Sequence, residues 1–355
     1  MSVVTEYVKV DPLSPDPGVM ARAASVIAAG GLVAFPTETV YGLGGNALDA
    51  DASRRIYAAK GRPSDNPLIV HIADMDHLDP LIEELPEQAW KLIEKAWPGP
   101  LTVILPKSGI VPYETTGGLQ TVAVRMPSHP TARAFIRAAG GYIAAPSANT
   151  SGRPSPTTAE HVREDLDGRI EMIIDGGPVR IGLESTIVDF TEDHPMILRP
   201  GFLDRETLLD ILGDVRLDPG LLHPGKETGA RPKAPGMRYR HYAPKAELTV
   251  YEGDEEAVIR RIRELARAYT GEGRKTGILC ALEHASAYAD TGGIVRSLGA
   301  GGDEEAIARN LFAALRDFDH LEADVILSEG FDTPRLGMAI MNRLLKAAGQ
   351  KREKV

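Results

Sequence analysis

The sequence lacks the features that mark several large classes of protein. Its 355 residues include one cysteine, Cys280, which excludes an intrachain disulfide framework and a cysteine-based zinc cluster. No hydrophobic run has the length of a membrane span, because the best one, from Ala23 to Phe35, is short and interrupted by Gly30 and Gly31. The opening residues, MSVVTEYVKVDPLSPDPG, lack the basic, apolar and small-residue order of a signal peptide. We therefore expect a soluble, cytoplasmic protein.

Two further absences concern nucleotides and nucleic acids. Basic residues are not in excess, and the net charge of −10 argues against a protein whose main task is to coat nucleic acid. The P-loop pattern G-x-x-x-x-G-K-[ST] occurs nowhere in the chain. What is present is ordinary for a globular protein, with 43% hydrophobic and 25% charged residues. The length is sufficient for two domains with separate cores.

The stretch KGRPSDNPLIVH concentrates several groups that could bind an anion. Lys60 and Arg62 follow a helical pattern, which Pro63 cannot continue. The amide of Asn66 comes just before a short apolar run that is typical of a buried strand and ends at His71. Two cations and an amide beside a strand suit a polyanion such as a nucleoside triphosphate. The alternative is a helix end whose cations are favoured by the helix dipole, and the stretch by itself favours this alternative.

Two loops rich in hydroxyl groups follow predicted strands. The predicted strand Leu32–Phe35 leads into PTETVYGLGGNA, whose glycines are expected to let the backbone approach a ligand. The predicted strand Tyr142–Ala145 leads into PSANTSGRPSPT, with a helix expected from about Ala159. Loops between a strand and a helix often bind anionic ligands in α/β proteins. Both loops could instead be polar connectors.

Arg125 lies inside the predicted strand TVAVRM. In a strand, Arg125 shares one face with Thr121 and Ala123. A charged side chain in such a position is costly to bury without a partner. Arg125 therefore either binds a carboxylate or phosphate of a ligand or pairs with an internal acid, and the sequence leaves both possibilities open.

The composition divides the chain into three parts. Residues 218–245 are rich in proline and end in APGMRYRHYAP, which is too proline-rich for a helix and too aromatic and basic for a passive tether. Strand and helix patterns alternate from residue 246 onward, which predicts a small, mostly parallel, Rossmann-like sheet. We predict an α/β catalytic domain at 1–217, a linker or lid at 218–245 and a Rossmann-like domain at 246–355.

Eight motifs in this order carry a family resemblance: PTETVYGLG, KGRP..NPL.VH, WPGPLT, VAVRMP, APSAN.SG..SPT, GLESTIVDF, LRPG and APGMRYRHYAP. Together they cover most of the chain, which resembles the two-domain form of the YrdC-like L-threonylcarbamoyladenylate synthases. The resemblance implies a twisted, mixed sheet with helices around a cationic cleft, followed by the small Rossmann-like domain. It also implies that the proline-rich linker folds over the cleft.

The resemblance implies an enzyme, a nucleotidyltransferase that converts L-threonine, bicarbonate or CO2, and ATP into threonylcarbamoyl-AMP and pyrophosphate. A partner complex would use the product to modify adenosine 37 of tRNAs that read codons beginning with A. Mg²⁺ would accompany ATP, although the sequence identifies no metal ligands. Stable tRNA binding is not expected, and neither is membrane association.

The same resemblance assigns roles to individual residues, none of them a covalent nucleophile. Threonine would be held by Thr39, His71, Arg125, Ala145 (through its backbone), Ser147 and Ser185. ATP would be held by Lys60, Arg62, Asn66, Thr121, Ser147, Ser155 and Arg199, with Arg238 and Tyr242 of the linker closing over it. Arg125 would bind the threonine carboxylate with two parallel hydrogen bonds. His71 could be a base for the threonine amine or a hydrogen-bonding positioner.

Two other classes of function compete with this interpretation. An RNA-binding protein could use a cationic cleft, although the acidic total charge and the lack of an aromatic ladder argue against it. A serine hydrolase could use Ser147 or Ser185, but neither lies in a G-x-S-x-G motif.

Overall fold

The computed structural model describes residues 3–222, 232–235 and 241–355. Contacts along the chain define two compact units. The first unit contains residues 1–151, 155–180 and 184–238. The second unit contains residues 239–355 together with two tripeptides, 152–154 and 181–183. The chain therefore leaves the first unit twice before the start of the predicted linker.

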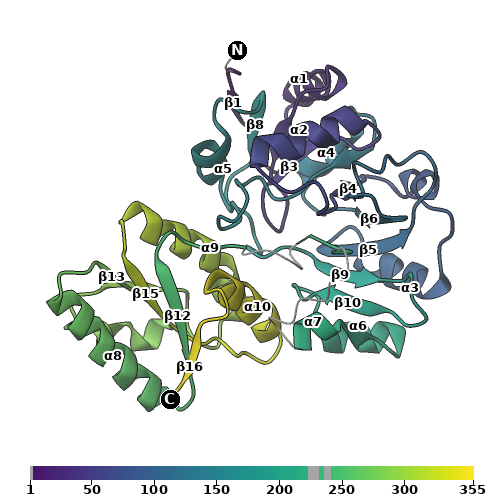
Figure 1. Ribbon diagram of the computed structural model, residues 1–355. Helices are drawn as coiled ribbons and strands as arrows, with labels where there is room; N and C mark the ends of the chain where they lie inside the picture. Colours follow the sequence, from purple (N-terminus) through teal and green to yellow (C-terminus); the bar gives the residue numbers. More distant parts are fainter. Residues whose placement is uncertain (1–2, 223–231, 236–240) are drawn as a thin grey trace. The chain divides into compact units, whose positions relative to one another are not determined.

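The first unit is built on a mixed sheet of eleven described strands, in the order β1-β8-β2-β3-β7-β4-β6-β5-β9-β10-β11 (Figure 1). The strands are β1 (Glu6–Lys9), β2 (Val33–Phe35), β3 (Gly42–Asn46), β4 (Ile69–His71), β5 (Leu101–Pro106), β6 (Thr121–Arg125), β7 (Ile143–Ala144), β8 (Met172–Asp175), β9 (Thr186–Asp189), β10 (Met196–Arg199) and β11 (Arg216–Leu217). The central strand β6 is parallel to β4 and antiparallel to β5. The predicted mixed sheet is confirmed.

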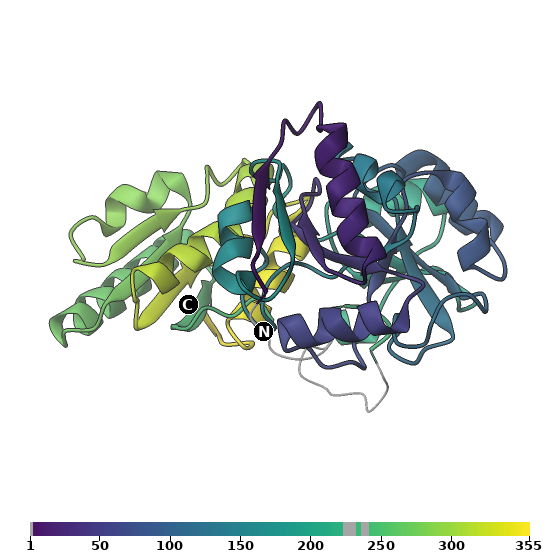
Figure 2. The same cartoon turned by 90° about the horizontal axis from the view of Figure 1, so that it is seen from above.

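Helices cover both faces of this sheet. They are α1 (Pro17–Ala28), α2 (Ala50–Lys60), α3 (Glu87–Ala96), α4 (Pro130–Ala138), α5 (Ala159–Leu166), α6 (Arg205–Leu212) and the short α7 (Pro219–Leu222). Ala34 of β2 belongs to the buried cluster that includes residues of α2, α3, α5 and α6, whereas Phe35 belongs to the cluster with α1 and α4. Successive residues of a strand point to opposite faces, so α1 and α2 lie on different sides of the sheet (Figure 2).

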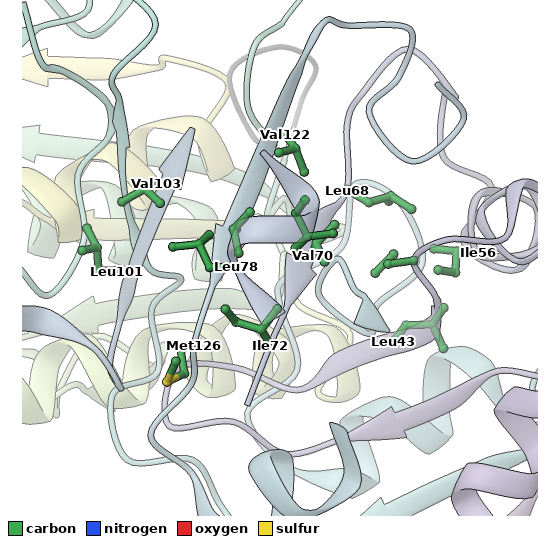
Figure 3. Packing of buried hydrophobic residues seen from close by; sticks show 14 of the residues in the cluster. Leu43, Ile56, Leu68, Val70, Ile72, Leu78, Leu101, Val103, Val122 and Met126 are labelled. Carbon is green, nitrogen blue, oxygen red and sulfur yellow. The ribbon is translucent and has the colours of Figure 1, made fainter. Parts of the chain in front are cut away.

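The larger core forms on the α2 side. Leu43 of β3, Ile56 of α2 and Val70 of β4 turn toward one another there, with Val103 and Val122 from the next strands (Figure 3). Each of these side chains is at most 1% exposed. Burial of one such side chain contributes about 1.5–3 kcal/mol. Since this face is filled with apolar groups, polar side chains of the same strands that face the other way are free to form a site.

Helix boundaries in the first unit follow local chemistry. Asp49 caps α2 by accepting a hydrogen bond from the backbone of Asp51, and Thr158 caps α5 in the same way with His161. Helix α2 ends at Lys60 because Gly61 adopts the left-handed conformation, with φ of 61°. The helix thus ends before Pro63, and Lys60 is presented at its last turn as the sequence predicts.

The glycines of PTETVYGLGGNA lie in a strand of the first sheet. Gly42, Gly44 and Gly45 form the buried strand β3. A Cβ atom on Gly44 would lie 2.9 Å from Ile143, and one on Gly42 would lie 3.1 Å from Phe35. These glycines therefore admit neighbouring side chains of the core, and their approach to a ligand stays a prediction.

The second unit is a parallel sheet of five described strands, in the order β14-β13-β15-β12-β16. The strands are β12 (Glu247–Glu252), β13 (Thr276–Cys280), β14 (Ile294–Ser297), β15 (Val325–Glu329) and β16 (Arg352–Lys354), and the helices are α8 (Glu255–Gly271), α9 (Glu304–His320) and α10 (Gly337–Ala347). Helix α8 lies on one face of this sheet and α9 and α10 lie on the other (Figure 1), as right-handed crossovers require. The predicted Rossmann-like arrangement is confirmed. None of the helices in the described residues combines the length and the apolar character that crossing a membrane requires.

Candidate functional site

A row of polar side chains crosses the middle of the first sheet. The register places His71 of β4 opposite Arg125 of β6, and Arg125 opposite Thr102 of β5. Directly opposed residues project from the same face, and all three side chains are buried. The ring of Phe35 meets the edge of His71 at a centroid distance of 6.1 Å, on the face covered by α1 and α4 farther along the sheet. Two of the predicted residues are thus adjacent, and Thr102 joins them without having been predicted.

Arg125 pairs with an acidic side chain of the first unit and also has an N–H group without a partner among the described residues. Its Nη2 atom lies 2.6 Å from Oε1 of Glu38, and each of these side chains is 5% exposed. Its Nη1 atom donates to the hydroxyl of Thr39 at 2.8 Å. Its Nε atom is buried and has no hydrogen-bond partner among the described residues. The internal acid that the sequence left open as an alternative exists, and a further N–H remains available to a ligand.

Glu38 is one of the residues of the polar row that sequence reasoning missed. Its second carboxylate oxygen accepts a hydrogen bond from the backbone N–H of Ser128 at 3.2 Å, so the carboxylate is fixed on both sides. The signal was present in the sequence, because a buried arginine requires an acid and Glu38 lies next to Thr39 in the PTET motif. The pairing fixes the guanidinium before any ligand arrives.

Ser185 and Arg199 extend the row toward the far edge of the sheet. The hydroxyls of Ser185 and Thr102 are 2.7 Å apart. Arg199 of β10 donates from Nε to the backbone oxygen of Ser185 at 3.0 Å and from Nη2 to its hydroxyl at 3.1 Å. The hydroxyls of Thr102 in β5 and of Ser185, just before β9, are therefore held between two arginines, which gives the row two fixed positive charges.

His71 is neutral at physiological pH. Burial, together with the positive charge of Arg125, lowers the pKa of His71 to about 3. Its Nδ1 atom lies 3.1 Å from the backbone oxygen of Ile69. A group that binds a proton so weakly is a poor acceptor for the proton of an ammonium group. The structure thus favours the positioning role for His71 over the role of a base.

The lowered pKa of His71 predicts how stability changes with pH. The unfolded chain binds a proton at His71 below its ordinary pKa of 6.5, whereas the folded chain does not until about pH 3. The contribution of His71 to the free energy of unfolding is therefore complete above pH 6.5 and is lost as the pH falls from 6.5 toward 3. Between pH 7 and pH 5, the wild type should lose about 2 kcal/mol more unfolding free energy than His71→Gln, measured by urea denaturation. Equal losses in the wild type and in His71→Gln would contradict the prediction.

Lys60 holds the loop PSANTSGRPSPT. Its ammonium group is buried, and it donates to the backbone oxygens of Ser147 and Asn149. The hydroxyl of Ser147 donates to the side-chain oxygen of Asn149 at 2.6 Å, and Ser147 also bridges to Gly42 of β3. The cation at the end of α2 and the hydroxyl-rich loop, which lie 87 residues apart, form one assembly.

The turn after α2 presents a buried amide. Arg62 donates from Nη2 to the backbone oxygens of Asn66 and Pro67, at 3.2 and 3.1 Å, and so closes the turn on itself. Asn66 is 1% exposed, and its side-chain oxygen has no partner among the described residues. Buried polar atoms are nearly always paired, so the amide of Asn66 is a candidate contact for a ligand.

Ser155 and Ala145 are buried beside this assembly. The hydroxyl of Ser155 donates to Oε1 of Glu184 at 2.6 Å, and Glu184, which was not predicted, directly precedes Ser185. The backbone N–H of Ala145 donates to the oxygen of Ile69 at 2.9 Å, which ties the start of the loop to β4. Thr121 begins β6 and is partly exposed. It lies about 13 Å along the strand from Arg125, two positions before Ala123, which is paired with Ile69 of β4.

The described part of the linker lies on the same face of the sheet. Lys233 makes an ion pair with Asp189 of β9 at 3.0 Å, and the backbone oxygen of Pro235 accepts a hydrogen bond from Arg199 at 3.4 Å. Between them, Ala234 is fully buried in an apolar cluster that includes Ile69 and Ala123. These two residues are two positions before His71 and Arg125, so residues 233–235 cover the sheet next to the polar row.

The remaining predicted residues lie elsewhere. Tyr242 belongs to the second unit, where it is buried with its ring 5.0 Å from that of Phe312. Arg238 lies outside the described residues. The part of the first unit that the structure describes thus connects Thr39, Lys60, His71, Arg125, Ala145, Ser147, Ser185 and Arg199 through direct contacts, strand register or neighbouring positions in the chain. Ser155 is joined to Ser185 through Glu184, and Arg62 and Asn66 lie in the turn after Lys60. Their individual roles toward threonine and ATP stay predictions.

Comparison with known proteins gives matches over both units. Residues 25–201 match a family described as "Telomere recombination", which groups Sua5, YciO and YrdC, and residues 204–349 match one described as "Threonylcarbamoyl-AMP synthase, C-terminal domain". A threonylcarbamoyl-AMP synthase of Pyrococcus abyssi is 52% identical over 333 residues, which cover 94% of this chain and 95% of the relative. Another, of Bacillus subtilis, is 49% identical over 340 residues, with coverages of 96% and 95%.

Comparison with solved structures gives the same result. The crystal structure of P. abyssi Sua5 complexed with L-threonine matches with a TM-score of 0.93 at 50% identity. The match covers 99% of this chain and 100% of the other. The similarity therefore extends over both sheets and includes the part of the sequence that carries the polar row.

Proposed function

Because the chain belongs to the threonylcarbamoyl-AMP synthase family, we propose that it makes threonylcarbamoyl-AMP and pyrophosphate from L-threonine, bicarbonate or CO2, and ATP. The observation that carries the proposal is the buried Arg125, which is already fixed by Glu38 and Thr39 and still has an unpartnered N–H. Such a group suits a small ligand with one carboxylate, which threonine has.

The polar row offers partners for each part of threonine. Arg125 binds the carboxylate, and the hydroxyls of Thr39 and Ser185 lie on either side of it for the amino acid's own polar groups. His71, held neutral, orients the amine instead of taking its proton. The amine and bicarbonate form a carbamate with loss of water, which requires that the amine be held uncharged and in place.

The second step is a displacement at phosphorus. A carbamate oxygen attacks the α-phosphorus of ATP, and the bond from that phosphorus to the pyrophosphate oxygen breaks. The chain contributes by positioning the reactants and neutralising charge, since no covalent nucleophile is required. The buried cations Lys60 and Arg199 would neutralise charge on the phosphates, and Arg62 and Asn66 of the turn after α2 would add a further cation and an amide.

Mg²⁺ is proposed to accompany ATP. Proteins usually bind it through one or two carboxylates and the substrate's own phosphates. Within residues 3–222, 232–235 and 241–355, no three His, Cys, Asp or Glu side chains are grouped so that they could hold a metal ion together. Glu184 and Ser155 offer oxygen atoms of the kind Mg²⁺ prefers. When bound, the ion would neutralise phosphate charge.

The product determines where the enzyme acts in a sequence of reactions. Threonylcarbamoyl-AMP is a mixed anhydride that water destroys, so a transferase that modifies adenosine 37 of tRNA must consume it soon after release. The linker beside the row, anchored by Lys233, is suited to exclude water during the reaction.

The proposal is tested by incubating the purified full-length protein with ATP, bicarbonate and L-threonine. Pyrophosphate release should depend on threonine, and a threonylcarbamoyl nucleotide should be detected by mass spectrometry. D-Threonine is the matched control, since it has the same groups in the wrong arrangement for the row. Release that does not depend on threonine, or labelling of Ser147 or Ser185 by serine-directed probes, would contradict the proposal.

A further inference from the structure

One face of α9 holds three separate pieces of chain within the second unit. Arg309, Phe312, Arg316 and Asp319 are spaced at three and four residues, so they form one stripe along the helix. The tripeptide 152–154, the tripeptide 181–183 and residues at the end of the linker, such as Tyr242, all contact this stripe. None of these α9 residues takes part in the proposed reaction.

Arg316 is the central residue of the stripe. Its side chain is 0% exposed, and its Nη2 atom donates to the backbone oxygen of Pro154 at 2.7 Å. Burial of a guanidinium is costly unless it is hydrogen-bonded, so a position this deep requires the carbonyl that it holds. Pro154 directly precedes Ser155, whose hydroxyl is bonded to Glu184.

Asp319 holds the same tripeptide from the next turn. Its Oδ2 atom lies 3.8 Å from Nη2 of Arg153, and its Oδ1 atom accepts a hydrogen bond from the backbone N–H of Lys245 at 2.7 Å. The backbone oxygen of Gly152 in turn accepts from the N–H of Ala243 at 2.8 Å. All three residues of the tripeptide are thus fixed to α9 or to the chain just before β12.

The second tripeptide packs against the beginning of the stripe. Gly182 has φ of +83°, and a Cβ atom there would lie 2.4 Å from Cα of Arg309, so only glycine fits against the helix backbone. Gly182 is two residues before Glu184. The two partners of the Ser155–Glu184 hydrogen bond therefore each follow a piece of chain that α9 holds.

We propose that the stripe on α9 positions Ser155 and Glu184 for ATP, with Arg316 as the main positioning residue. This inference rests on the proposed function and gives the second unit a part in it. Ser155 and Glu184 lie one residue beyond their tripeptides, so a shift of either tripeptide moves a side chain of the nucleotide site. The second unit then acts on nucleotide binding through the chain itself, without contributing a catalytic residue.

The experiment compares Arg316→Met with Arg343→Met in the full-length protein. Arg343 of α10 is also 0% exposed, and it donates at 3.4 Å to the backbone oxygen of Ala339 in its own helix. Both variants remove a buried guanidinium from the second unit, so both should lower the melting temperature. Only Arg316→Met should weaken binding of the unreactive analogue α,β-methylene-ATP, by roughly tenfold in calorimetry. Threonine affinity, measured without nucleotide, should stay unchanged in both, and Arg316→Lys should retain part of the nucleotide affinity.

Two outcomes would overturn the inference. One is an unchanged affinity of Arg316→Met for the analogue. The other is an equal loss in both variants, which would show a general effect of destabilising the second unit. Failure of the proposed function is distinguishable from both, since it appears as absence of threonine-dependent pyrophosphate release in the wild type.

Discussion

Replacing Arg125 by alanine is expected to weaken threonine binding by about 100-fold, because the positive charge that faces the carboxylate and a charge-assisted hydrogen bond to it are lost. Arg125→Lys should lose less, about tenfold, since lysine keeps the charge but not the planar fork. Isothermal titration calorimetry with L-threonine measures both values. Unchanged threonine affinity in a folded alanine variant would show that Arg125 serves only its internal partner, Glu38.

The ion pair with Glu38 makes a stability control necessary. Removal of Arg125 alone leaves a buried carboxylate without its cation, which typically costs about 3–5 kcal/mol. The double variant Arg125→Met with Glu38→Gln removes both charges and should regain most of that loss in urea denaturation. It should not regain threonine affinity. This separates the binding role of Arg125 from its structural role, because recovery of both properties together would mean that misfolding alone caused the loss of binding.

Replacing Lys60 by methionine is expected to have the second large effect, on ATP. The ammonium group of Lys60 holds the backbone oxygens of Ser147 and Asn149, so its loss releases the hydroxyl-rich loop as well as removing a charge from the nucleotide site. The value of kcat/KM for ATP should fall by about 100-fold. The corresponding value for threonine at saturating ATP should fall less. Threonine parameters that change while those for ATP do not would reverse the assignment.

Lys107 provides the matched control for Lys60. It is also a buried lysine of the first unit, and it donates to the backbone oxygen of Val111 at 3.0 Å, in a loop with no predicted site residue. Lys107→Met should lower the melting temperature without a selective change in the KM for ATP. An equal rise in the KM for ATP in both variants would attribute the effect of Lys60→Met to lost stability.

Sequence reasoning selected most of the residues that the structure connects because they lie in short, dense motifs. Lys60 follows a helical pattern, His71 ends a predicted strand, and Arg125 is a charge within a predicted strand. The partners of these groups were harder to find. Glu38 is 87 residues from Arg125 and Thr102 is 83 residues from Ser185, and no local pattern states which distant groups will meet.

The glycines of PTETVYGLGGNA also show how little a local pattern says about distant neighbours. Glycine suits both a loop that approaches a ligand and a strand that is crowded by its neighbours, so Gly42, Gly44 and Gly45 are compatible with either structure. The packing of Phe35 and Ile143 against them decides the matter in favour of the strand. A glycine in the sequence indicates that a position has no room for a side chain, but only the tertiary structure shows which group fills that space.

By itself, the sequence determined the two sheets, the ends of helices such as α2, and the residue types available for an anionic substrate, because periodicity, capping and composition act over a few residues. The tertiary structure alone decided that His71 is neutral, that Arg125 pairs with Glu38, and that α9 holds the chain next to Ser155 and Glu184. These properties depend on burial and on pairs of groups far apart in the chain. Their energies are set by the local dielectric environment and by distance, and both quantities exist only once the chain has folded.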